Sequence, residues 1–343
     1  MRVLVTGATG FLGSHVARLL ADRGDDVRVL VRRTSDRSRL DGLELDYVEG
    51  DVTDAASVER AVEGTDLVFH CAAVVEFGPK DPSFMEAINV GGTRHVLDAA
   101  AERDILAVYV SSLAALGATP PDQPPQDESW WATGAMAATY EHQKRAAHEH
   151  ARKLIAGGAR IRIAMPGGIY GVGDQSQMYD LIRYFSRYPL LVGYMPEIRQ
   201  STVSVDDCAE ALLLIADGGT DGGEYIVVAG AHTVREWLGF IAEGAGHRPP
   251  LVYLPTRTIK ALGRPGGRVA GWLGQSPTMV PEIVAVATHD SAYRGDKLRE
   301  ELGWAPRDLR TGMAEMAQQI QAEAATARAA RRAERAASRA RRV

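Results

Sequence analysis

The chain begins with a strand, a glycine turn and a helix in immediate succession. Residues 2–6 form an apolar run of strand length, and residues 11–23 carry leucine and valine at helical spacing. Glycines occupy positions 7, 10 and 13, between and at the start of these segments. This connection restricts the fold, because a strand turns so tightly into a helix only where the backbone can adopt the conformations that glycine tolerates.

The alternation of strand and helix continues as far as residue 165. Further apolar runs predict strands at 27–31, 47–48, 66–70, 107–111 and 160–165. Helical spacing and capping residues predict helices at 54–62, 83–103 and 139–156. Strands that are apolar throughout are typical of a parallel sheet covered on both faces by right-handed crossovers. We therefore predict an α/β protein with a Rossmann-type, doubly wound parallel sheet.

Composition excludes several classes of protein. With 45% hydrophobic and 24% charged residues and a net charge of −5, the chain is neither disordered nor an evident nucleic-acid binder. Only Cys71 and Cys208 are present, so a disulfide scaffold is excluded and we predict no metal site. An apolar strand follows Met1 directly, and no apolar run reaches the roughly 18 residues of a membrane span. We expect no signal peptide and a cytoplasmic protein.

The glycine turn indicates a bound pyrophosphate. Glycine lets the backbone approach a phosphate closely, and the free N–H groups at the start of the next helix present a positive dipole end to it. We therefore predict cofactor contacts from this turn by Gly7, Thr9, Gly10, Phe11, Leu12 and Gly13. A tight turn without a ligand is the alternative interpretation.

Charged residues after the next two strands bear on the identity of the cofactor. Arg32 and Arg33 follow the second strand, where an acidic residue usually binds the ribose hydroxyls of NAD. Because arginine binds phosphate in a forked geometry, Arg32 favours NADP(H), with NAD(H) or an exposed basic turn as the alternatives. Asp51 ends the third strand, where the adenine edge should lie, although an aspartate there can also be a simple cap.

After Pro166 the regular alternation gives way to stretches rich in tyrosine, leucine, proline and glycine. We expect residues 1–165 to form the dinucleotide-binding Rossmann domain, to which 198–228 return. Residues 166–197 and 229–321 should form a smaller C-terminal substrate-binding lobe. Residues 322–343 contain seven arginines and two glutamates among alanines. This basic tail favours a helix but has no apolar stripe, so we expect it to lie outside the core.

Several short motifs follow one another in a fixed order. They are Thr6–Gly13, Gly50-Asp51, His70-Cys71-Ala72-Ala73, Asn89-Val90-Gly91-Gly92-Thr93, Ser111-Ser112 with Gly117, Tyr140-x-x-x-Lys144, Pro166–Gly171, Val205-Asp206-Asp207 and Glu301–Pro306. With these motifs the chain resembles the extended short-chain dehydrogenase/reductases, also called the NAD-dependent epimerase/dehydratase family. The resemblance runs from residue 1 to about 320.

The wider pattern is most similar to the branch that holds dihydroflavonol 4-reductases, 3-beta-hydroxysteroid dehydrogenases and hopanoid-associated sugar epimerases. The resemblance implies further cofactor contacts from Val52, Ala72 and Ala73, and from the backbone between Pro166 and Ile169. A homodimer is usual for such proteins.

Tyr140 and Lys144 lie one helical turn apart, so their side chains share one face of a predicted helix. A phenol has an ordinary pKa of ~10, and we expect the Lys144 ammonium, together with an oxidised nicotinamide, to lower that of Tyr140 toward ~7. Tyr140 is then the predicted general acid or base. The resemblance implies that Lys144 also binds the cofactor ribose and that Ser112, five residues before Gly117, hydrogen-bonds the substrate oxygen.

Other residues in these motifs receive structural interpretations. A second Tyr-x-x-x-Lys spacing, from Tyr293 to Lys297, lies late in the chain and reads as structural. Residues 141–143 are Glu-His-Gln, where the family often has serine before the lysine, and we expect His142 on the helix surface rather than in catalysis. We interpret Asn89 as a structural residue, and the pair 206–207 as a helix cap rather than a metal site.

Aromatic residues in two stretches predict the substrate site. We expect a pocket between the loop 118–138 and the later lobe, with the candidate lining residues Phe77, Trp130, Trp131, Tyr179 and Tyr194. An apolar lining favours a hydrophobic substrate. The alternative, a sugar diphosphate, is kept open by the arginines at 183, 187 and 199.

Together these features predict an NADP(H)-dependent oxidoreductase that transfers hydride between the nicotinamide and a hydroxyl or ketone of a fairly hydrophobic small molecule. One alternative is a nucleotide-sugar epimerase or dehydratase with tightly bound NAD. Another is a non-catalytic dinucleotide-binding sensor, against which the retained Ser112, Tyr140 and Lys144 argue. For the basic tail, a solvated helix is the favoured interpretation, and contact with anionic lipid or RNA is the alternative.

Overall fold

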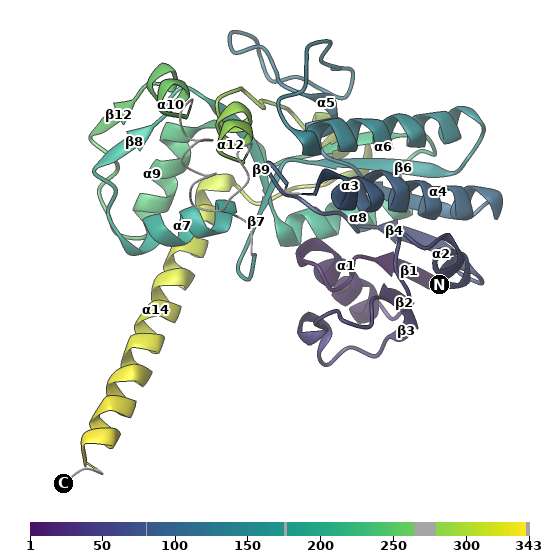
Figure 1. Ribbon diagram of the computed structural model, residues 1–343, viewed down its shortest axis with the longest axis horizontal. Coiled ribbons are helices and arrows are strands. Elements are labelled where there is room, and N and C mark those ends of the chain that lie inside the picture. Colours follow the sequence, from purple (N-terminus) through teal and green to yellow (C-terminus); the bar gives the residue numbers. More distant parts are fainter. Residues whose placement is uncertain (80, 175–176, 264–278, 341–343) are drawn as a thin grey trace.

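A parallel seven-stranded sheet forms the larger part of the computed structural model, which describes residues 1–79, 81–174, 177–263 and 279–340 (Figure 1). The strand order is β10-β6-β5-β4-β1-β2-β3. In chain order the strands are β1 (Arg2–Thr6), β2 (Asp26–Val31), β3 (Asp46–Glu49), β4 (Leu67–His70), β5 (Leu106–Val110), β6 (Ile161–Pro166) and β10 (Glu224–Val227). The order reverses between β1 and β4, and in such sheets ligands bind at the carboxyl ends of the strands beside the reversal. The predicted doubly wound sheet is confirmed.

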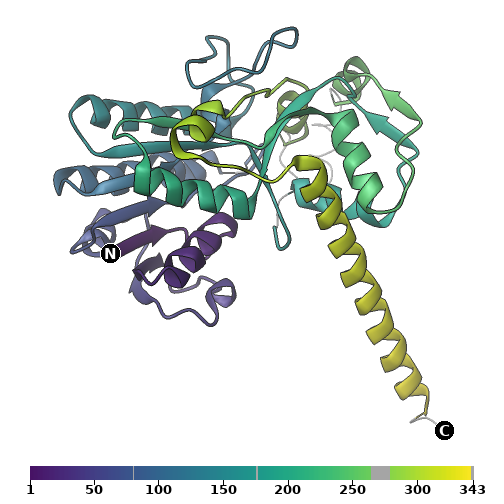
Figure 2. The ribbon, with the colours of Figure 1, turned by 180° about the vertical axis from the view of Figure 1, so that it is seen from behind.

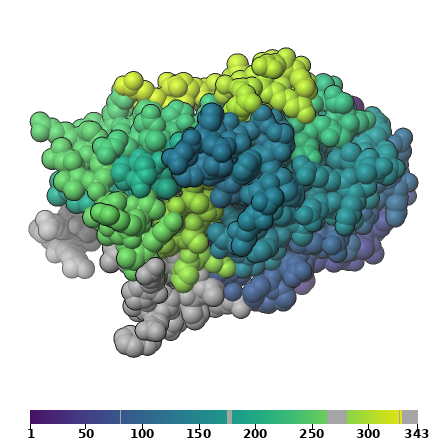
Figure 3. All heavy atoms as spheres, turned by 90° about the horizontal axis from the view of Figure 1, so that it is seen from above, coloured from purple at the N-terminus to yellow at the C-terminus, as the bar shows by residue number. Residues whose placement is uncertain are grey.

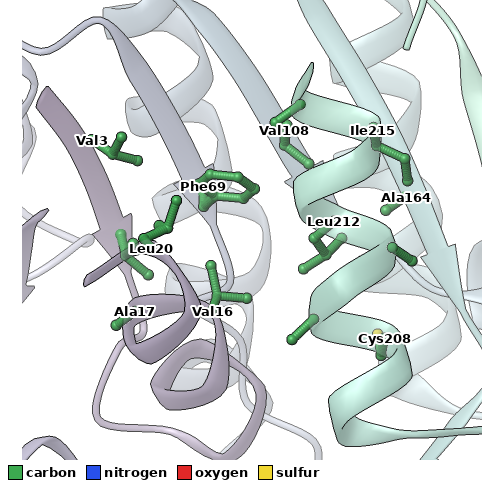
Figure 4. Close-up of a cluster of buried hydrophobic side chains, with 14 of the residues drawn as sticks. Val3, Val16, Ala17, Leu20, Phe69, Val108, Ala164, Cys208, Leu212 and Ile215 are labelled. Atoms are coloured by element: carbon green, nitrogen blue, oxygen red, sulfur yellow. The ribbon is translucent and has the colours of Figure 1, made fainter. Parts of the chain in front are cut away.

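Both faces of the sheet are buried, which is why its strands are apolar throughout. Along β1, Val3 and Val5 belong to one buried cluster, whereas Leu4 belongs to the cluster on the opposite face. Figure 4 shows the first cluster, in which side chains of α1 (Phe11–Asp22) and α8 (Val205–Gly218) meet Phe69 and Val108 of the sheet. The other face is covered by α2 (Ala55–Val62), α4 (Thr93–Glu102) and α6 (Thr139–Ala156).

The helix predicted over 83–103 is divided into three segments. These are α3 (Pro82–Glu86), a π-helical segment η2 (Ala87–Gly92) and α4. The wide turn lies where Gly92 approaches the Val52 side chain, since a Cβ there would meet Val52 at 2.7 Å. Helical spacing alone does not reveal such a break, because the apolar positions on either side of it keep the same period.

The residues beyond β6 build a second group of elements. A three-stranded sheet has the order β11-β9-β7, and β8 pairs with β12 in a separate ribbon. Their bounds are β7 (Gly168–Tyr170), β8 (Val192–Tyr194), β9 (Arg199–Ser204), β11 (Gly230–Thr233) and β12 (Val252–Leu254). The helices that follow or flank them are α7 (Gln177–Arg187), α9 (Val234–Gly244), α10 (Thr256–Gly263), α12 (Met279–Ala287), α13 (Asp296–Leu302) and α14 (Leu309–Ala340).

This second group has its own buried cluster. Ile182, Leu238, Ile241 and Met313, from α7, α9 and α14, pack in it. Within 198–228, α8 and β10 pack on the large sheet as expected, but β9 pairs with β7 and β11. Residues 264–278 of the predicted lobe and 341–343 of the predicted tail lie outside the described residues.

The basic tail continues α14 rather than starting a new element. This helix runs over 32 residues, and its first part packs against α9 through Met313, Ala317 and Ile320. Beyond Gln321 it projects away from the body of the protein (Figure 2). In the described part of the chain, no helix is both long and apolar enough to cross a membrane.

Two glycines of α9 test the packing between α9 and α14. A Cβ at Gly244 would lie 2.3 Å from the Ala314 backbone oxygen, whereas a Cβ at Gly239 would meet nothing within 4 Å. We expect Gly244→Ala to lower the free energy of unfolding by about 1–3 kcal/mol, since two backbones must separate. The matched variant Gly239→Ala should raise it by up to ~1 kcal/mol. Equal urea midpoints for Gly244→Ala and the parent chain would contradict this packing.

Candidate active site

The glycine turn closes tightly at the carboxyl end of β1. Gly7 has a φ of +72°, and its carbonyl accepts a hydrogen bond from the Gly10 amide at 2.9 Å. A Cβ at Gly7 would lie 2.7 Å from the Ala72 backbone, and one at Gly13 would lie 2.2 Å from the Gly7 oxygen. Neither position can carry a side chain without opening the turn, so both glycines are required by close backbone contacts.

This turn forms one wall of a cavity beside the point where the strand order reverses. The cavity extends from Arg32 and Ser35, after β2, to Ala73 and Val74, after β4. Predicted cofactor residues on its wall are Gly7, Thr9, Gly10, Phe11, Leu12, Gly13, Arg32, Asp51, Val52, Ala72 and Ala73. An elongated cavity with a helix N-terminus on its wall fits a dinucleotide.

Not every wall residue of the first cavity was predicted as a cofactor contact. Cys71 lines it as well, and burial raises the pKa of its thiol to about 12, so the sulfur is an un-ionised wall group. Asp51 is both wall and cap, because its Oδ1 accepts hydrogen bonds from the Thr53 amide and hydroxyl, each at 2.9 Å. Pro166 and Ile169 lie at the end of β6 and in β7, outside the lining of this cavity.

Lys144 is buried where α6 crosses the end of β5. Its side chain is 2% exposed, and its Nζ donates a hydrogen bond to the Val110 carbonyl at 2.9 Å. Nζ also lies 5.1 Å from the centre of the Tyr109 ring. Burial lowers the pKa of Lys144 to about 7, a shift that the nearby Cys71 opposes. The lysine therefore sits in a low-dielectric position beside the wall of the first cavity.

Tyr140 lies one turn before Lys144 and beside Ser112. Ser112 follows β5 and caps the short helix α5 (Leu113–Leu116), because its Oγ accepts a hydrogen bond from the Ala114 amide at 3.1 Å. Burial raises the pKa of Tyr140 to about 12, and a hydrogen bond with the Ser112 side chain opposes the rise. The structure thus brings the predicted Ser112 and Tyr140 together.

In the protein without cofactor, burial raises the pKa of Tyr140 to about 12. The expected fall toward neutrality included an oxidised nicotinamide as well as Lys144, and it stays a prediction for the cofactor-bound protein. Burial destabilises the phenolate, and Lys144 directs its ammonium to the Val110 carbonyl instead. Burial also weakens the lysine as a cation, since its own pKa falls to about 7. Tyr140 is therefore a neutral phenol at neutral pH.

The unusual residue before Lys144 has a clear packing role. Gln143 is buried, and its Oε1 accepts a hydrogen bond from Asn89 Nδ2 at 3.0 Å. The same Asn89 amide exchanges two hydrogen bonds of 2.8 Å with the Val74 backbone. Gln143 and Asn89 therefore join α6 to the segment after β4, which supports the structural interpretation of Asn89.

The structural interpretations of other motif residues also hold. His142 is exposed on α6. Tyr293 is buried and donates its hydroxyl to the Gly117 carbonyl at 2.5 Å, while Lys297 Nζ donates to the Glu224 carbonyl at 3.0 Å. Tyr293 and Lys297 are thus committed to these carbonyls, and neither residue lines the first cavity.

The acidic pair after β9 does not provide the helix cap that we expected. Ser204 caps α8, since its Oγ accepts a hydrogen bond from the Asp207 amide at 3.1 Å. Asp206 pairs with His15 at 2.8 Å, and Asp207 pairs with Arg307 at 3.2 Å. Among the described residues, no group of three or more His, Cys, Asp or Glu side chains is placed to hold a metal ion.

A second cavity lies beneath the loop that follows β5. Its wall consists of residues from Ala118 to Ala137, closed by Glu141 of α6 and by His289. His289 Nε2 lies 3.5 Å from Glu141 Oε1, and the other Glu141 oxygen accepts hydrogen bonds from the Ala137 and Ala138 amides. Seen from above, this loop covers the surface between the helices of the large sheet and the second group of elements (Figure 3).

The predicted substrate residues are dispersed. Trp130 lines the second cavity, and its indole N–H donates to the Ala118 carbonyl at 3.2 Å. Trp131 instead packs on α6, where guanidinium carbons of two arginines lie 4.2 and 4.4 Å from its ring centre. Tyr179 and Tyr194 pack against the buried cluster of α7, α9 and α14, and Phe77 is half-buried after β4. The structure does not bring these five side chains together.

The sequence model of the NAD dependent epimerase/dehydratase family matches residues 3–229. This span contains all seven strands of the large sheet, the glycine turn, and Ser112, Tyr140 and Lys144.

Two relatives match nearly the whole chain. Sterol demethylase protein B of Methylococcus capsulatus is 30% identical over 321 residues, which are 92% of this chain and 97% of that protein. The 4-hydroxy-2-methyl-3-oxo-4-farnesyl-3,4-dihydroquinoline-1-oxide ketoreductase of Stigmatella aurantiaca is 30% identical over 325 residues, with 90% and 92% covered. Among solved structures, UDP-glucose 4-epimerase of Thermus thermophilus in complex with NAD has a TM-score of 0.71 at 25% identity, covering 94% of this chain and 99% of that one.

The buried ammonium of Lys144 makes a prediction for stability. Its pKa is about 7 in the folded protein against an ordinary value of 10.5. Below about pH 7 both states are protonated and burial of the charge opposes folding fully; the penalty disappears as the pH rises toward 10.5. Over this range the unfolding free energy of the parent chain should rise relative to Lys144→Met, by at most ~1.4 kcal/mol per pH unit.

The difference between these two proteins isolates Lys144, because all other groups are common to both. The control is Lys153→Met, which removes an exposed lysine of the same helix and should leave the pH dependence unchanged. Parallel pH profiles for the parent and Lys144→Met in urea titrations would contradict a buried, destabilised ammonium.

Proposed function

The chain belongs to the NAD-dependent epimerase/dehydratase family of extended short-chain dehydrogenase/reductases, and we propose that it is an NADP(H)-dependent reductase of an apolar ketone. The observation that carries this proposal is the neutral Tyr140 phenol, which is hydrogen-bonded to Ser112. Its sequence neighbours Ala137 and Glu141 line a largely apolar cavity. Reduction needs a proton donor next to the carbonyl oxygen, and a neutral phenol supplies one.

The first cavity supplies the groups that would hold the cofactor. The glycine turn and the start of α1 suit the pyrophosphate, and Arg32 suits the 2′-phosphate of NADP. Lys144, which interacts with the wall residue Cys71, is the candidate for the ribose hydroxyls. The reduced nicotinamide would supply the hydride.

The protein's own residues handle the proton. Tyr140 gives its hydroxyl proton to the substrate oxygen as the carbonyl carbon is reduced, and the hydrogen bond from Ser112 stabilises the resulting phenolate. The direction we propose is reduction, which is also the direction in the name of the ketoreductase relative.

The second cavity suits an apolar substrate body. Trp130, Met136 and alanines at 118, 132, 135 and 137 supply its apolar wall, while Glu141 and His289 supply polar groups. Ala137 and Glu141 of its wall lie within three residues of Tyr140 in the chain, while Tyr140 itself is not one of the lining residues. The names of two relatives refer to a sterol and to a farnesylated quinoline, which are also apolar compounds.

A nucleotide-sugar epimerase with bound NAD is the second candidate, and the likeness to UDP-glucose 4-epimerase favours it. Such a substrate needs free cations for its diphosphate. Arg199 is already bonded to Asp290 and to the carbonyls of Pro120, Pro121 and Gln123 at 2.8–2.9 Å. Arg183 pairs with Asp180 at 2.8 Å. Arg187, in contrast, leaves its Nε without a hydrogen-bond partner. The commitments of Arg199 and Arg183 favour the ketone over the sugar diphosphate.

Replacement of the phenol tests the proposal. We expect Tyr140→Phe to lower kcat for NADPH-dependent reduction of apolar ketones by about 10²- to 10⁴-fold, because the proton donor is lost. Its affinity for NADP⁺ should stay within about threefold of the parent's, since the hydroxyl acts on the substrate. The matched variant Tyr293→Phe removes the other tyrosine of this spacing and should keep kcat while losing ~1 kcal/mol of stability. Unchanged activity in Tyr140→Phe would refute the assignment.

A pair of neighbouring arginines tests the cofactor preference. Arg32 lines the first cavity and Arg33, the next residue, is exposed. We expect Arg32→Glu to weaken NADP⁺ binding by at least about tenfold, because a charge-assisted bond to the 2′-phosphate is lost and repulsion is added. NAD⁺ binding should not weaken, and Arg33→Glu should change neither. Thermal-shift titrations measure all four affinities; equal stabilisation of the parent by both cofactors would count against NADP.

A further inference from the structure

Exposed apolar side chains concentrate on one part of the second group of elements. The described residues expose twelve large apolar side chains, and eight of them come from α7, the residue directly after it, β8, β12 and the residues directly before the two strands. They are Leu181, Tyr184, Tyr188, Leu191, Val192, Leu251, Val252 and Leu254. We call this set the apolar face. Leu191 is 76% exposed and Leu251 83%, so these two lie almost fully in water.

Strand pairing brings the exposed aliphatic side chains together on one short ribbon. β8 and β12 run parallel, with Val192 opposite Val252 and Tyr194 opposite Leu254. Val252 and Leu254 are two residues apart, so they point to the same side of the ribbon. Leu191 and Leu251 come one residue earlier, so by the same alternation they point to the other side. Because the strands are parallel, both leucines lie at the same end of the ribbon, and exposed aliphatic side chains therefore project from both of its sides.

Ring contacts join the ribbon to α7. The ring centres of Tyr188 and Tyr184 lie 5.2 Å apart, and those of Tyr184 and Phe185 lie 5.7 Å apart. Phe185 in turn lies 6.3 Å from Tyr194 of β8. Tyr184 of α7 and Tyr188, directly after it, are thus linked to β8 through the buried Phe185. Tyrosine, with an apolar ring and a polar hydroxyl, is enriched where proteins meet the interface of a lipid bilayer.

The charges around the apolar face are mainly positive. Arg248 lies shortly before β12, and Arg257 and Lys260 lie on α10 directly after it; all three are exposed. Of the nearby acids, Asp180 pairs with Arg183, and Glu197 accepts hydrogen bonds from Thr256. A face of this kind, with free cations at its edge, is complementary to an anionic surface.

The basic tail leaves the protein beside this face. Gln321 Nε2 donates to the Ser186 carbonyl of α7 at 2.9 Å and to the Ala245 carbonyl, just after α9, at 2.8 Å. Ser186 lies two residues before the segment Tyr188–Val192, and Ala245 lies six residues before the segment Leu251–Leu254. From there α14 extends outward (Figures 1 and 2). Residues 322–343 carry seven arginines against two glutamates in a chain whose net charge is −5.

We propose that the apolar face and the basic tail together dock the protein on an anionic lipid bilayer. The exposed leucines and valines enter the interface, the tyrosines lie at the headgroup level, and the net positive charge of the tail is attracted to the anionic headgroups. The tail has no apolar stripe, so it is unsuited to packing against a partner helix. Its arginines can instead bind an anionic surface by electrostatic attraction. Stable attachment to a membrane surface needs two signals, and apolar side chains next to a polybasic segment provide both.

Vesicle co-sedimentation tests the docking surface with the full-length chain. We expect binding to vesicles of equimolar phosphatidylglycerol and phosphatidylcholine, and much weaker binding to pure phosphatidylcholine. The double variant Leu191→Glu/Leu251→Glu should bind the anionic vesicles at least about tenfold more weakly, because it places charge in the apolar face. The control Tyr47→Glu changes an exposed aromatic on β3 and should bind like the parent.

A second variant separates the two signals. Glutamine replaces the seven arginines of the tail, Arg328, Arg331, Arg332, Arg335, Arg339, Arg341 and Arg342. It should lose binding at least about tenfold and also lose most of the salt dependence that the parent shows, since exposed charges are screened by salt. Unchanged stabilisation by NADP⁺ will establish that each variant is folded.

Two results would overturn the proposal. One is the absence of binding to anionic vesicles by the parent chain. The other is that Leu191→Glu/Leu251→Glu leaves vesicle binding unchanged but converts an oligomer to a monomer in sedimentation velocity, which would assign the apolar face to contact between copies of this chain.

Discussion

The hydrogen bond from the buried Lys144 ammonium to the Val110 carbonyl is the contact on which the candidate site depends. It fixes α6 across the carboxyl end of β5, and so it sets Tyr140, one turn earlier, beside Ser112. A second tie, from Gln143 to Asn89, joins the same helix to the segment after β4. Burial of Lys144 destabilises its protonated form and lowers its pKa to about 7. The site is therefore a strained electrostatic arrangement that the surrounding packing maintains.

The sheet places the proposed cofactor cavity and the proposed substrate cavity at neighbouring strands. The glycine turn after β1 and the residues after β2 to β4 surround the first cavity, and the loop after β5 covers the second. Ser112 follows β5 as the cap of α5, and Tyr140 lies near the start of α6. A carbonyl held beside the phenol would thus meet the cofactor from one side and the apolar wall from the other. Burial, which keeps Tyr140 neutral, also excludes the water that would compete for the proton.

Local features of the sequence predicted the fold and the wall of the first cavity. Right-handed crossovers leave few possible orders for the strands of a parallel sheet, and the wall residues directly follow those strands. Features set by tertiary contact were missed. The pKa of Tyr140 depends on burial and on where Lys144 points, neither of which spacing reveals. Tyr179 and Tyr194 were predicted in the substrate site from their aromatic character, but that character serves a packed cluster equally well. The role of Gln143 required its distant partner Asn89 to be known.

The central claim is that this site moves a hydride to an apolar carbonyl while Tyr140 supplies the proton. Reduction with NADPH carrying deuterium on the transferred position of the nicotinamide tests it most directly, with the product examined by mass spectrometry. The account predicts one deuterium on the new carbinol carbon of an apolar alcohol and oxidation of one cofactor per product. Turnover of a nucleotide sugar without net oxidation of the cofactor, and no labelled alcohol from any apolar ketone, would contradict it.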